Sequence, residues 1–204
     1  MITPLLSTQL DAATATLTAA FDADPIYTFV LPEAAGRARY LPPFWRAVTR
    51  NALLHGHAYA APDAAGIALW MPPGREALSL RDSLRTGFSL QRAITAFPAE
   101  ARRRFLAFVD YADPIHEELM SKRPHWYLWV LGVRPERQGQ GLGGQLIAPA
   151  LALADRDGLT CYLETESERN VAFYRRHGFE VAREGEVPGY GLRLWMMARP
   201  GAVG

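Results

Sequence analysis

The chain has 204 residues and a formal net charge of +1, and 49% of its residues are hydrophobic against 21% charged. These values are typical of a soluble globular protein, and we expect one domain over residues 1–204 with a sizeable core. A nucleic-acid-binding face normally shows as an excess of basic residues, so we expect no nucleic-acid partner.

Cys161 is the single cysteine, so no intramolecular disulfide can form. The first ten residues, MITPLLSTQL, lack the basic start of a signal peptide. No apolar run approaches the roughly 18 residues that a membrane-spanning helix needs. We therefore expect a cytoplasmic protein with no membrane partner.

The N-terminal part of the sequence predicts helices. Residues 8–21 carry apolar side chains at helical spacing. Asp24-Pro25 is expected to end this helix, because a residue before proline is pushed out of the helical region. Pro42-Pro43 is expected to separate a short helix from a second one at about residues 44–54.

The next segments alternate between strand and helix signals. HAYAA and GIALWMPP flank the turn PDAAG, a pattern that predicts a β-hairpin. Residues 75–124 are rich in Arg, Leu, Phe and Ala and predict two or three helices. After Gly178, FEVAREGEV and YGLRLWMMAR predict a closing antiparallel pair of strands, with Pro188-Gly189 as the turn.

A glycine-rich turn follows the most apolar strand of the sequence. Residues 126–133, WYLWVLGV, predict a strand in the interior of a sheet. The turn QGQGLGG opens a helix at about residues 141–154. Its glycines let backbone N–H groups point at one spot, and the helix N-terminus adds partial positive charge. This combination predicts a phosphate-binding site.

Two kinds of phosphate ligand compete for this turn. Gly139, Gly141 and Gly144 match the dinucleotide fingerprint G-x-G-x-x-G, and Glu164 lies at a suitable distance to meet a ribose. However, RPERQ separates the turn from its strand, and the remaining chain is too short for the further βαβ units. A nicotinamide-dinucleotide protein therefore remains the weakest of three functional alternatives.

The second interpretation uses the motif Q-x-x-G-x-G that begins at Gln138. With LGVRPE before it, and YLET and N-x-x-x-Y-x-x-x-G-F after it, this motif resembles the signature of the GNAT superfamily, the acetyl-CoA-dependent N-acetyltransferases. The resemblance covers residues 126–179. ALWMPPG and FDADP resemble a subgroup that includes the puromycin-type acetyltransferases.

The resemblance implies a fold and a cosubstrate. The fold is an α/β acyltransferase fold with a central mixed β-sheet flanked by helices, and a helical insertion before the central strand. The cosubstrate is acetyl-CoA, and we expect no metal. In this family the strand before the turn contacts the pantetheine arm and the turn holds the pyrophosphate. The implied cofactor-binding residues are Leu131, Gly132, Val133, Gln138, Gly139, Gln140, Gly141, Leu142, Gly143, Asn170 and Tyr174.

Two residues affect the helices around this site. Pro149 removes an N–H inside the helix that follows the turn and is expected to kink it. Asn170 is a good N-cap residue and is expected to begin the short helix VAFYRRH. By resemblance, Asn170 also lies near the cofactor arm.

Tyr174 is the implied general acid. A phenol with a pKa of about 10 is protonated at neutral pH, and it can donate a proton to the departing CoA thiolate. A tyrosine on an amphipathic helix is also an ordinary core residue, and that alternative remains open. Its place in N-x-x-x-Y-x-x-x-G-F favours the catalytic role.

The implied reaction is direct attack of an amine on the thioester, which requires a general base and a donor for the carbonyl oxygen. A backbone N–H near Val133 is the expected donor. Glu164, on the strand beside the glycine-turn strand, is the leading candidate for the base. The weaker candidates are Glu117, Glu118, His116 and His125.

The acceptor pocket is expected to come from the N-terminal half of the chain. Aromatic walls and one carboxylate would suit a small, partly apolar cation, although core packing also explains each aromatic residue. No strongly acidic groove is evident, which favours a small-molecule amine over a basic protein tail. The candidate substrate-binding residues are Asp24, Tyr27, Phe29, Tyr59 and Trp70.

The sequence leaves the function and the assembly with alternatives. The first is an acetyl-CoA-dependent N-acetyltransferase acting on a small amine. The second is a non-catalytic acyl-CoA-binding or sensing module on the same fold, and Tyr174 favours the enzyme because binding alone needs no acid there. A monomer and a homodimer are both compatible with the sequence.

Overall fold

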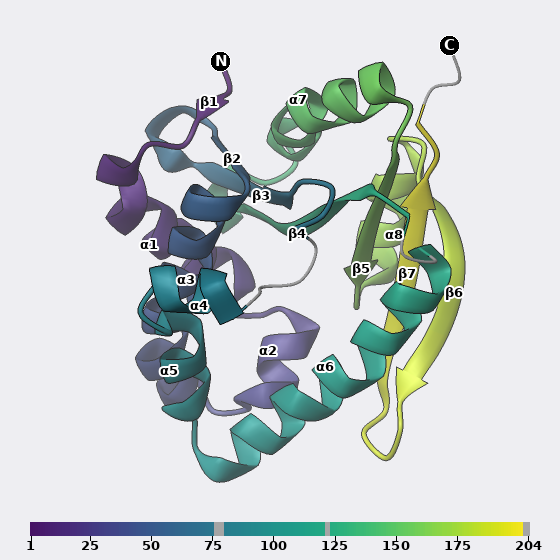
Figure 1. Cartoon of the computed structure of the whole chain (residues 1–204). Coiled ribbons are helices and arrows are strands. Elements are labelled where there is room, and N and C mark those ends of the chain that lie inside the picture. The colour runs from purple at the N-terminus through teal and green to yellow at the C-terminus, as the bar shows by residue number, and fades with distance from the viewer. Residues whose placement is uncertain (76–79, 121–122, 202–204) are drawn as a thin grey trace.

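The computed structural model describes residues 1–75, 80–120 and 123–201. In these ranges the chain forms one seven-stranded mixed β-sheet with helices on both faces (Figure 1), which confirms the predicted fold class. The strands are β1 (Thr3–Pro4), β2 (His57–Ala60), β3 (Gly66–Met71), β4 (His125–Val133), β5 (Thr160–Thr165), β6 (Glu180–Val187) and β7 (Leu192–Arg199). The α-helices are α1 (Leu10–Phe21), α2 (Pro25–Val30), α3 (Ala34–His55), α4 (Leu80–Arg85), α5 (Ser89–Thr95), α6 (Ala99–Met120), α7 (Leu142–Asp157) and α8 (Glu168–Arg175).

The predicted interior strand is β4, the fourth strand in the order β1-β2-β3-β4-β5-β7-β6. β4 and β5 are parallel, and the other neighbouring strands are antiparallel. Both predicted hairpins, β2–β3 and β6–β7, are confirmed. Because the described sheet is mainly antiparallel, it does not match the doubly wound sheet of a dinucleotide-binding fold.

Each face of the sheet has its own hydrophobic core. On one face, α7 buries Leu146 and Ile147 against Trp126 and Leu128 of β4. On the other face, the helices that precede β4 bury a larger and more aromatic cluster, which includes Trp45 of α3. The candidate site lies among these aromatic side chains, so the N-terminal half supplies the wall that faces the sheet.

A β-bulge in β4 changes which face its side chains meet. Leu69 of β3 is opposite Val130, whereas the next residue of β3, Trp70, is opposite Leu128. Trp129 is therefore an extra residue on β4, and a bulge of this kind increases local twist and redirects side chains. As a result Trp129 and Val130 both pack toward the aromatic core.

The parallel pair β4–β5 is short compared with the strands that form it. Its register runs from His125 opposite Thr160 to Tyr127 opposite Tyr162 and ends there. β4 continues to Val133 and β5 to Thr165, so the facing edges of both strands are without a strand partner beyond this point. Separated strands cannot satisfy each other's backbone groups, which leaves those groups available to a ligand.

One of the two proline predictions needs correction. Pro42-Pro43 does not divide the helix, since α3 runs unbroken from residue 34 to residue 55. Proline lacks an N–H, so the carbonyls of residues 38 and 39 lose their helical partners, but both residues are exposed to water. Leu41 and Phe44, on either side of the two prolines, are buried in the core and hold the helix together. Pro149 lies inside α7, which continues to residue 157, and the kink expected there stays a prediction.

The predicted helical insertion before β4 is confirmed as α4, α5 and α6. Residues 76–79 and 121–122 of this segment lie outside the described ranges. α6 contacts both α2 and β6 and so crosses the end of the molecule where β4 and β5 separate (Figure 1). None of the helices in the described part of the chain is long and apolar enough to cross a membrane.

Gly132 offers a test of how tightly α1 packs on β4. A Cβ at Gly132 would lie 2.8 Å from Leu17 Cδ2 and 3.0 Å from Phe21 Cε2. We expect Gly132→Ala to lower the free energy of unfolding by about 1–3 kcal/mol, measured in urea, because overpacking forces α1 away from the sheet.

Gly36→Ala is the matched control. Gly36 lies in helix α3, and a methyl group added there would meet only Leu31 Cδ2, at 3.7 Å. Alanine favours a helix over glycine by about 0.5–1 kcal/mol, so this variant should be as stable as the parent or more stable. Equal destabilisation by both substitutions would contradict the close contact at Gly132.

Candidate active site

The glycine-rich turn forms one wall of a groove of about 720 Å³. Gly139 and Gly141 have φ angles of 75° and 77°, and a Cβ at either position would meet no atom within 4 Å. These two glycines are therefore needed for their left-handed backbone rather than for space. Gly141 is the N-cap of α7, so the first N–H groups of this helix are free to bind an anion.

Two further glycines serve packing rather than turn geometry. A Cβ at Gly143 would lie 3.1 Å from the Phe173 ring, and one at Gly144 would lie 2.8 Å from the His177 ring. Both rings come from α8 and the turn that follows it. Glycine at these positions lets that segment approach the first turn of α7 and close the groove.

The backbone of β4 supplies another wall of the groove. Arg134 N donates to Ala65 O, and antiparallel hydrogen bonds alternate along a strand, so Gly132 is also bonded toward β3. Leu131 and Val133 then direct their backbone groups to the opposite side, where the parallel pairing has ended. The Gln138 side chain uses one of these groups, since its Nε2 donates to Val133 O at 3.0 Å.

These features fit the predicted acetyl-CoA. The free N–H groups at the start of α7 suit a pyrophosphate, and the free edge of β4 suits the amides of a pantetheine arm. The groove also presents cationic side chains for phosphate oxygens: Arg137, Arg169 and Arg176. Two of the predicted cofactor-binding residues do not line the groove: Tyr174, and Gln140, whose Oε1 accepts from Arg137 Nε at 3.1 Å.

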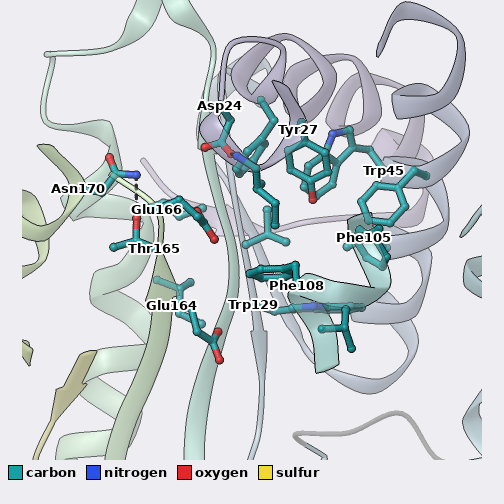
Figure 2. Close-up of a pocket in the computed structure, with 18 of the residues that line it drawn as sticks. Asp24, Tyr27, Trp45, Phe105, Phe108, Trp129, Glu164, Thr165, Glu166 and Asn170 are labelled. Carbon is teal, nitrogen blue, oxygen red and sulfur yellow. Dashed lines mark hydrogen bonds between the residues drawn. The ribbon is translucent and has the colours of Figure 1, made fainter. Parts of the chain in front are cut away.

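A cavity of about 190 Å³ lies between the separated strands β4 and β5 (Figure 2). Both this cavity and the groove are lined by Phe21, Asp24, Leu131 and Asn170, so the two spaces meet at these residues. One side of the cavity is aromatic, and its rings come from α2, α3, α6 and the β4 bulge: Tyr27, Phe44, Trp45, Phe105, Phe108 and Trp129.

The side of the cavity formed by β5 and the α1–α2 connection is acidic. Asp24, Glu166 and Glu164 follow one another along it, as Figure 2 shows. Burial raises the pKa of Glu164 to about 7, against the lowering effect of the Tyr127 and Tyr162 hydroxyls. Burial also raises the pKa values of Asp24 and Glu166, and the charge of Asp24 raises the pKa of Glu166 further.

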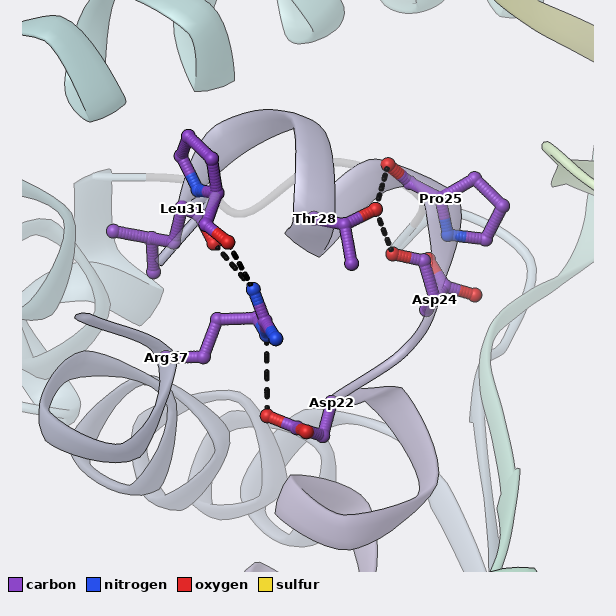
Figure 3. A network of polar contacts seen from close by, with 7 residues as sticks. Asp22, Asp24, Pro25, Thr28, Leu31 and Arg37 are labelled. Carbon is purple, nitrogen blue, oxygen red and sulfur yellow. Dashed lines mark hydrogen bonds and ion pairs between the residues drawn. The ribbon is translucent and has the colours of Figure 1, made fainter. Parts of the chain in front are cut away.

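The position of Asp24 depends on the connections between the first three helices (Figure 3). Asp24 is the N-cap of α2, and its Oδ1 accepts from Ile26 N at 3.1 Å. Arg37 of α3 donates to Leu31 O, just after α2, and pairs with Asp22, just after α1, at 3.2 Å. This one side chain therefore ties the ends of α1 and α2 to α3. Asp24 is therefore held at the junction of cavity and groove by local structure.

Tyr174 of α8 lines the cavity and is 7% exposed. Burial raises the pKa of its phenol, and the nearby charges of Glu166 and Asp24 raise it further. The phenol is therefore protonated throughout the physiological pH range and is able to donate. The structure thus brings the predicted acid close to the carboxylates.

Glu164 contacts a histidine pair on the side away from the groove. His116 Nδ1 lies 3.8 Å from Glu164 Oε1, and His116 Nε2 lies 2.7 Å from His125 Nε2. His125 Nδ1 donates to Arg123 O at 2.8 Å. The predicted base Glu164 and the two weaker histidine candidates are therefore neighbours, with Glu164 on the cavity wall and the histidines behind it.

Several predicted residues lie away from the cavity. Glu117 and Glu118 are exposed on α6, and Glu118 pairs with Arg183. Phe29 packs edge-on against Tyr190. None of these side chains lines the cavity or the groove, so the structure does not place them at the site.

The hairpin aromatics Tyr59 and Trp70 also need correction as pocket residues. Both pack into the core on the α7 side of the sheet, and Trp70 is fully buried there. Successive side chains of a strand point to opposite faces of the sheet, so an aromatic residue in a strand can lie on either face. The sequence did not reveal which face carries the cavity.

Asn170 is also placed differently from its prediction. Ser167 is the N-cap of α8, and Asn170 lies one turn inside the helix. Its Nδ2 donates to Thr165 Oγ1 at 3.1 Å, a contact visible in Figure 2. Asn170 therefore joins α8 to the end of β5 beside the groove.

The sequence did not lead us to predict Glu166, the carboxylate that lies between Asp24 and Glu164 on the cavity wall. Glu166 follows β5 two residues after Glu164, and side chains two residues apart in extended chain share a face. That spacing was a usable signal. The aromatic residues Trp45, Phe105 and Phe108 carried no comparable signal, because helical aromatics at regular spacing are indistinguishable from core residues in a sequence.

In residues 1–75, 80–120 and 123–201, no three His, Cys, Asp or Glu side chains are grouped to hold a metal ion. The prediction that no metal is needed stays a prediction. The expectation that no acidic groove exists is wrong for the described chain, because folding collects Asp24, Glu164 and Glu166 around one cavity.

The site lies in a part of the chain that matches a protein-family model. The model of the acetyltransferase (GNAT) family matches residues 68–179. This range begins in β3 and includes β4, the glycine-rich turn, α7, β5 and α8, which are the elements that form the groove and one wall of the cavity.

Curated relatives are similar over about half of the chain. An uncharacterized N-acetyltransferase of Schizosaccharomyces pombe is 32% identical over 99 residues, which are 47% of this chain and 39% of that protein. A peptidyl-lysine N-acetyltransferase of Salmonella typhimurium, YjaB, is 30% identical over 102 residues, which are 50% of this chain and 66% of that protein. The matches thus span less than two thirds of either relative.

Solved structures resemble the whole fold at low sequence identity. Arylalkylamine N-acetyltransferase 2 from Aedes aegypti has a TM-score of 0.69 at 16% identity and covers 98% of both chains. A protein of Corynebacterium glutamicum, described as histone acetyltransferase HPA2 and related acetyltransferase, has a TM-score of 0.67 at 20% identity. It covers 100% of this chain and 97% of that chain, and at these identities both likenesses show the fold alone.

The raised pKa of Glu164 predicts how stability changes with pH. The folded state holds this proton up to about pH 7, whereas the ordinary carboxyl releases it near 4.5, so the folded state is progressively destabilised between those values. Glu164→Gln removes this cost. We expect the variant to exceed the parent in unfolding free energy by about 3 kcal/mol above pH 7.

Urea unfolding at several pH values measures this difference. It should vanish toward pH 4.5, where the parent carboxyl is also neutral. Glu117→Gln, an exposed change on α6, is the control and should leave the pH dependence unaltered. A constant difference between Glu164→Gln and the parent at all pH values would contradict a buried titrating carboxyl.

Proposed function

The chain belongs to the acetyltransferase (GNAT) family, and on that premise we propose that it transfers an acetyl group from acetyl-CoA to the amine of a small molecule. The observation that supports this proposal best is the meeting of groove and cavity at Asp24, Leu131 and Asn170. A groove suited to phosphates and an acidic cavity suited to an amine open onto one another there.

Binding of acetyl-CoA is assigned to the groove. Free N–H groups of the turn and of the first turn of α7 would hold the pyrophosphate, helped by Arg137 and Arg176. The backbone groups of Leu131, on the free edge of β4, would hold the pantetheine amides. When bound, acetyl-CoA supplies the activated acetyl group as a thioester.

The carboxylates prepare the amine. An ammonium ion enters the cavity in its charged form and must lose a proton before it can act as a nucleophile. Glu164, with its pKa near 7, is well matched to accept that proton at neutral pH, directly or through water. Glu166 and Asp24 lie nearer to the groove and would hold the amine in place.

Two donors serve the acetyl group. A backbone N–H of β4 at Val133 faces the open side of the strand, where it would stabilise the negative charge that develops on the carbonyl oxygen. Tyr174 is protonated and lines the cavity, and we assign it the role of proton donor to the leaving sulfur.

A small molecule is favoured over a protein substrate by the size and enclosure of the acidic space. The cavity of about 190 Å³ is closed by α2, α3 and α6 on the side away from the groove. If the substrate were a protein, the cavity would have to be open at both ends, because the chain continues on both sides of the modified residue. The puromycin-type subgroup, a cytoplasmic location, and a monomeric or homodimeric state belong to the same proposal and rest on the sequence.

Ligand binding and turnover test the proposal in two steps. Thermal unfolding with acetyl-CoA, CoA or NADH should show stabilisation by the first two only, by about 2.7 kcal/mol at 100 times the dissociation constant. Thiol release from acetyl-CoA in the presence of primary amines should then depend on the amine. Stabilisation by acetyl-CoA without release of thiol for any amine would instead indicate a non-catalytic acyl-CoA-binding module.

Tyr174→Phe tests the assigned proton donor. Loss of the phenolic proton should lower kcat by about 10²- to 10⁴-fold, the usual range for general acid catalysis, while acetyl-CoA binding is retained. Steady-state thiol release and a thermal-shift titration measure the two properties separately. Tyr40→Phe, which changes a ring packed against Phe97 outside the site, should keep full activity. Unchanged kcat in Tyr174→Phe would remove the residue from the mechanism.

A further inference from the structure

The polar and apolar groups of the cavity are separated rather than mixed. Asp24, Glu164 and Glu166 lie on the side formed by β5 and the α1–α2 connection, and the rings of Trp45, Phe105 and Phe108 lie on the α3 and α6 side (Figure 2). We propose that the acceptor is a primary amine with one charged head and an apolar body of aromatic type. Its ammonium group would lie between Asp24 and Glu166, and its ring would contact Trp45, Phe105 and Phe108. This inference rests on the proposed function and adds the chemical class of the acceptor.

The acidic end is suited to a single ammonium group. Burial raises the pKa values of both Asp24 and Glu166, and the nearby charge of Asp24 raises that of Glu166 further. A cation between them would relieve that repulsion and allow both to ionise. Because Asp24 also borders the groove, an amine held there would be next to the position assigned to the acetyl group.

The aromatic end is a rigid apolar surface. Phe44 contacts Trp45 and Phe105 with ring centroids 5.2 and 5.7 Å apart, and Tyr27 contacts Trp45 at 5.1 Å. These rings hold one another through edge-to-face and tilted contacts, so the surface is formed without a ligand. A planar ring could add to this cluster with the same geometry.

The cavity volume limits the apolar body to about one ring. An apolar protein cavity of about 150 Å³ is known to hold benzene. The present cavity, about 190 Å³, would therefore hold one benzene-sized ring and a short linker to the amine. A bulkier or branched body would have to extend into the groove, where it would compete with the pantetheine arm.

A second positive charge is disfavoured by the same separation. Asp113, the remaining acidic residue of the cavity lining, influences Glu164 and so belongs to the acidic end. Among the described residues, the rings at the opposite end have no carboxylate beside them on the cavity wall. The far ammonium of a linear diamine would thus lose its hydration without gaining an ion pair.

Three amines of similar reach separate these possibilities: 2-phenylethylamine, n-butylamine and 1,4-diaminobutane. We expect kcat/KM for thiol release from acetyl-CoA to be at least tenfold higher for 2-phenylethylamine than for n-butylamine, and lowest for 1,4-diaminobutane. Equal values for the three amines, or a preference for the diamine, would overturn the proposed acceptor class.

Variants connect this preference to the two ends of the cavity. Phe108→Ala should raise KM for 2-phenylethylamine about tenfold and leave KM for n-butylamine within twofold. Glu166→Gln should weaken both amines. Leu106→Ala, on the exposed face of the same helix, is the control and should change neither value. Equal effects of Phe108→Ala on both amines would mean that the ring does not contact this residue.

A binding measurement separates failure of this inference from failure of the proposed function. Trp45 and Trp129 line the cavity, so tryptophan fluorescence reports amine binding without turnover. Saturable quenching by 2-phenylethylamine at lower concentration than by n-butylamine, without thiol release, would support the acceptor class and reject the catalytic proposal. Thiol release without selective binding would reject the acceptor class alone.

Discussion

The separation of β4 from β5 is the constraint on which the rest of the site depends. The two strands pair from His125 to Tyr127 and then diverge, although both continue for several residues. Paired strands would have used the backbone groups of Leu131 and Val133 and left no space between them. Their separation produces both the free strand edge in the groove and the cavity that continues beneath it.

The bulge at Trp129 and the helices before β4 complete this arrangement. The bulge directs two consecutive side chains to the same face, which adds the Trp129 ring to the aromatic wall. α6 also supplies Phe105 and Phe108 to the cavity wall (Figure 2). The cavity is therefore enclosed by elements that are distant in sequence from the glycine-rich turn.

The carboxyls of the cavity wall lower the stability of the fold, although they would favour binding of a cation. Glu164 and Glu166 would be more stable neutral inside the fold, because burial penalises their ionised forms. Part of the free energy of folding is thus used to hold carboxyls where solvent does not fully satisfy them. A cationic guest would offset this penalty, so the carboxyls that destabilise the folded state are those proposed to bind an amine.

Much of the groove could be predicted from the sequence because its signals are local. The strand, the left-handed glycines and the helix N-terminus lie within about twenty consecutive residues, and backbone geometry alone relates them. Tyr174 was predicted from its motif, and the structure places it on the cavity wall. Proline signals were less reliable, because core packing on both sides of Pro42-Pro43 held α3 together.

The sequence by itself determined the two β-hairpins, the interior strand β4, the phosphate-suited turn and the membership of Glu164 and Tyr174 in one structural unit. Only the tertiary structure decided which aromatic residues face the cavity, since Trp45 and Trp70 look alike in sequence and lie on opposite faces of the sheet. It also decided that Asp24 lies close enough to Glu166 for its charge to raise the pKa of that carboxyl, although the two residues are more than a hundred positions apart. Local propensity and periodicity describe neighbours along the chain, whereas such contacts depend on how the packed layers bring distant segments together.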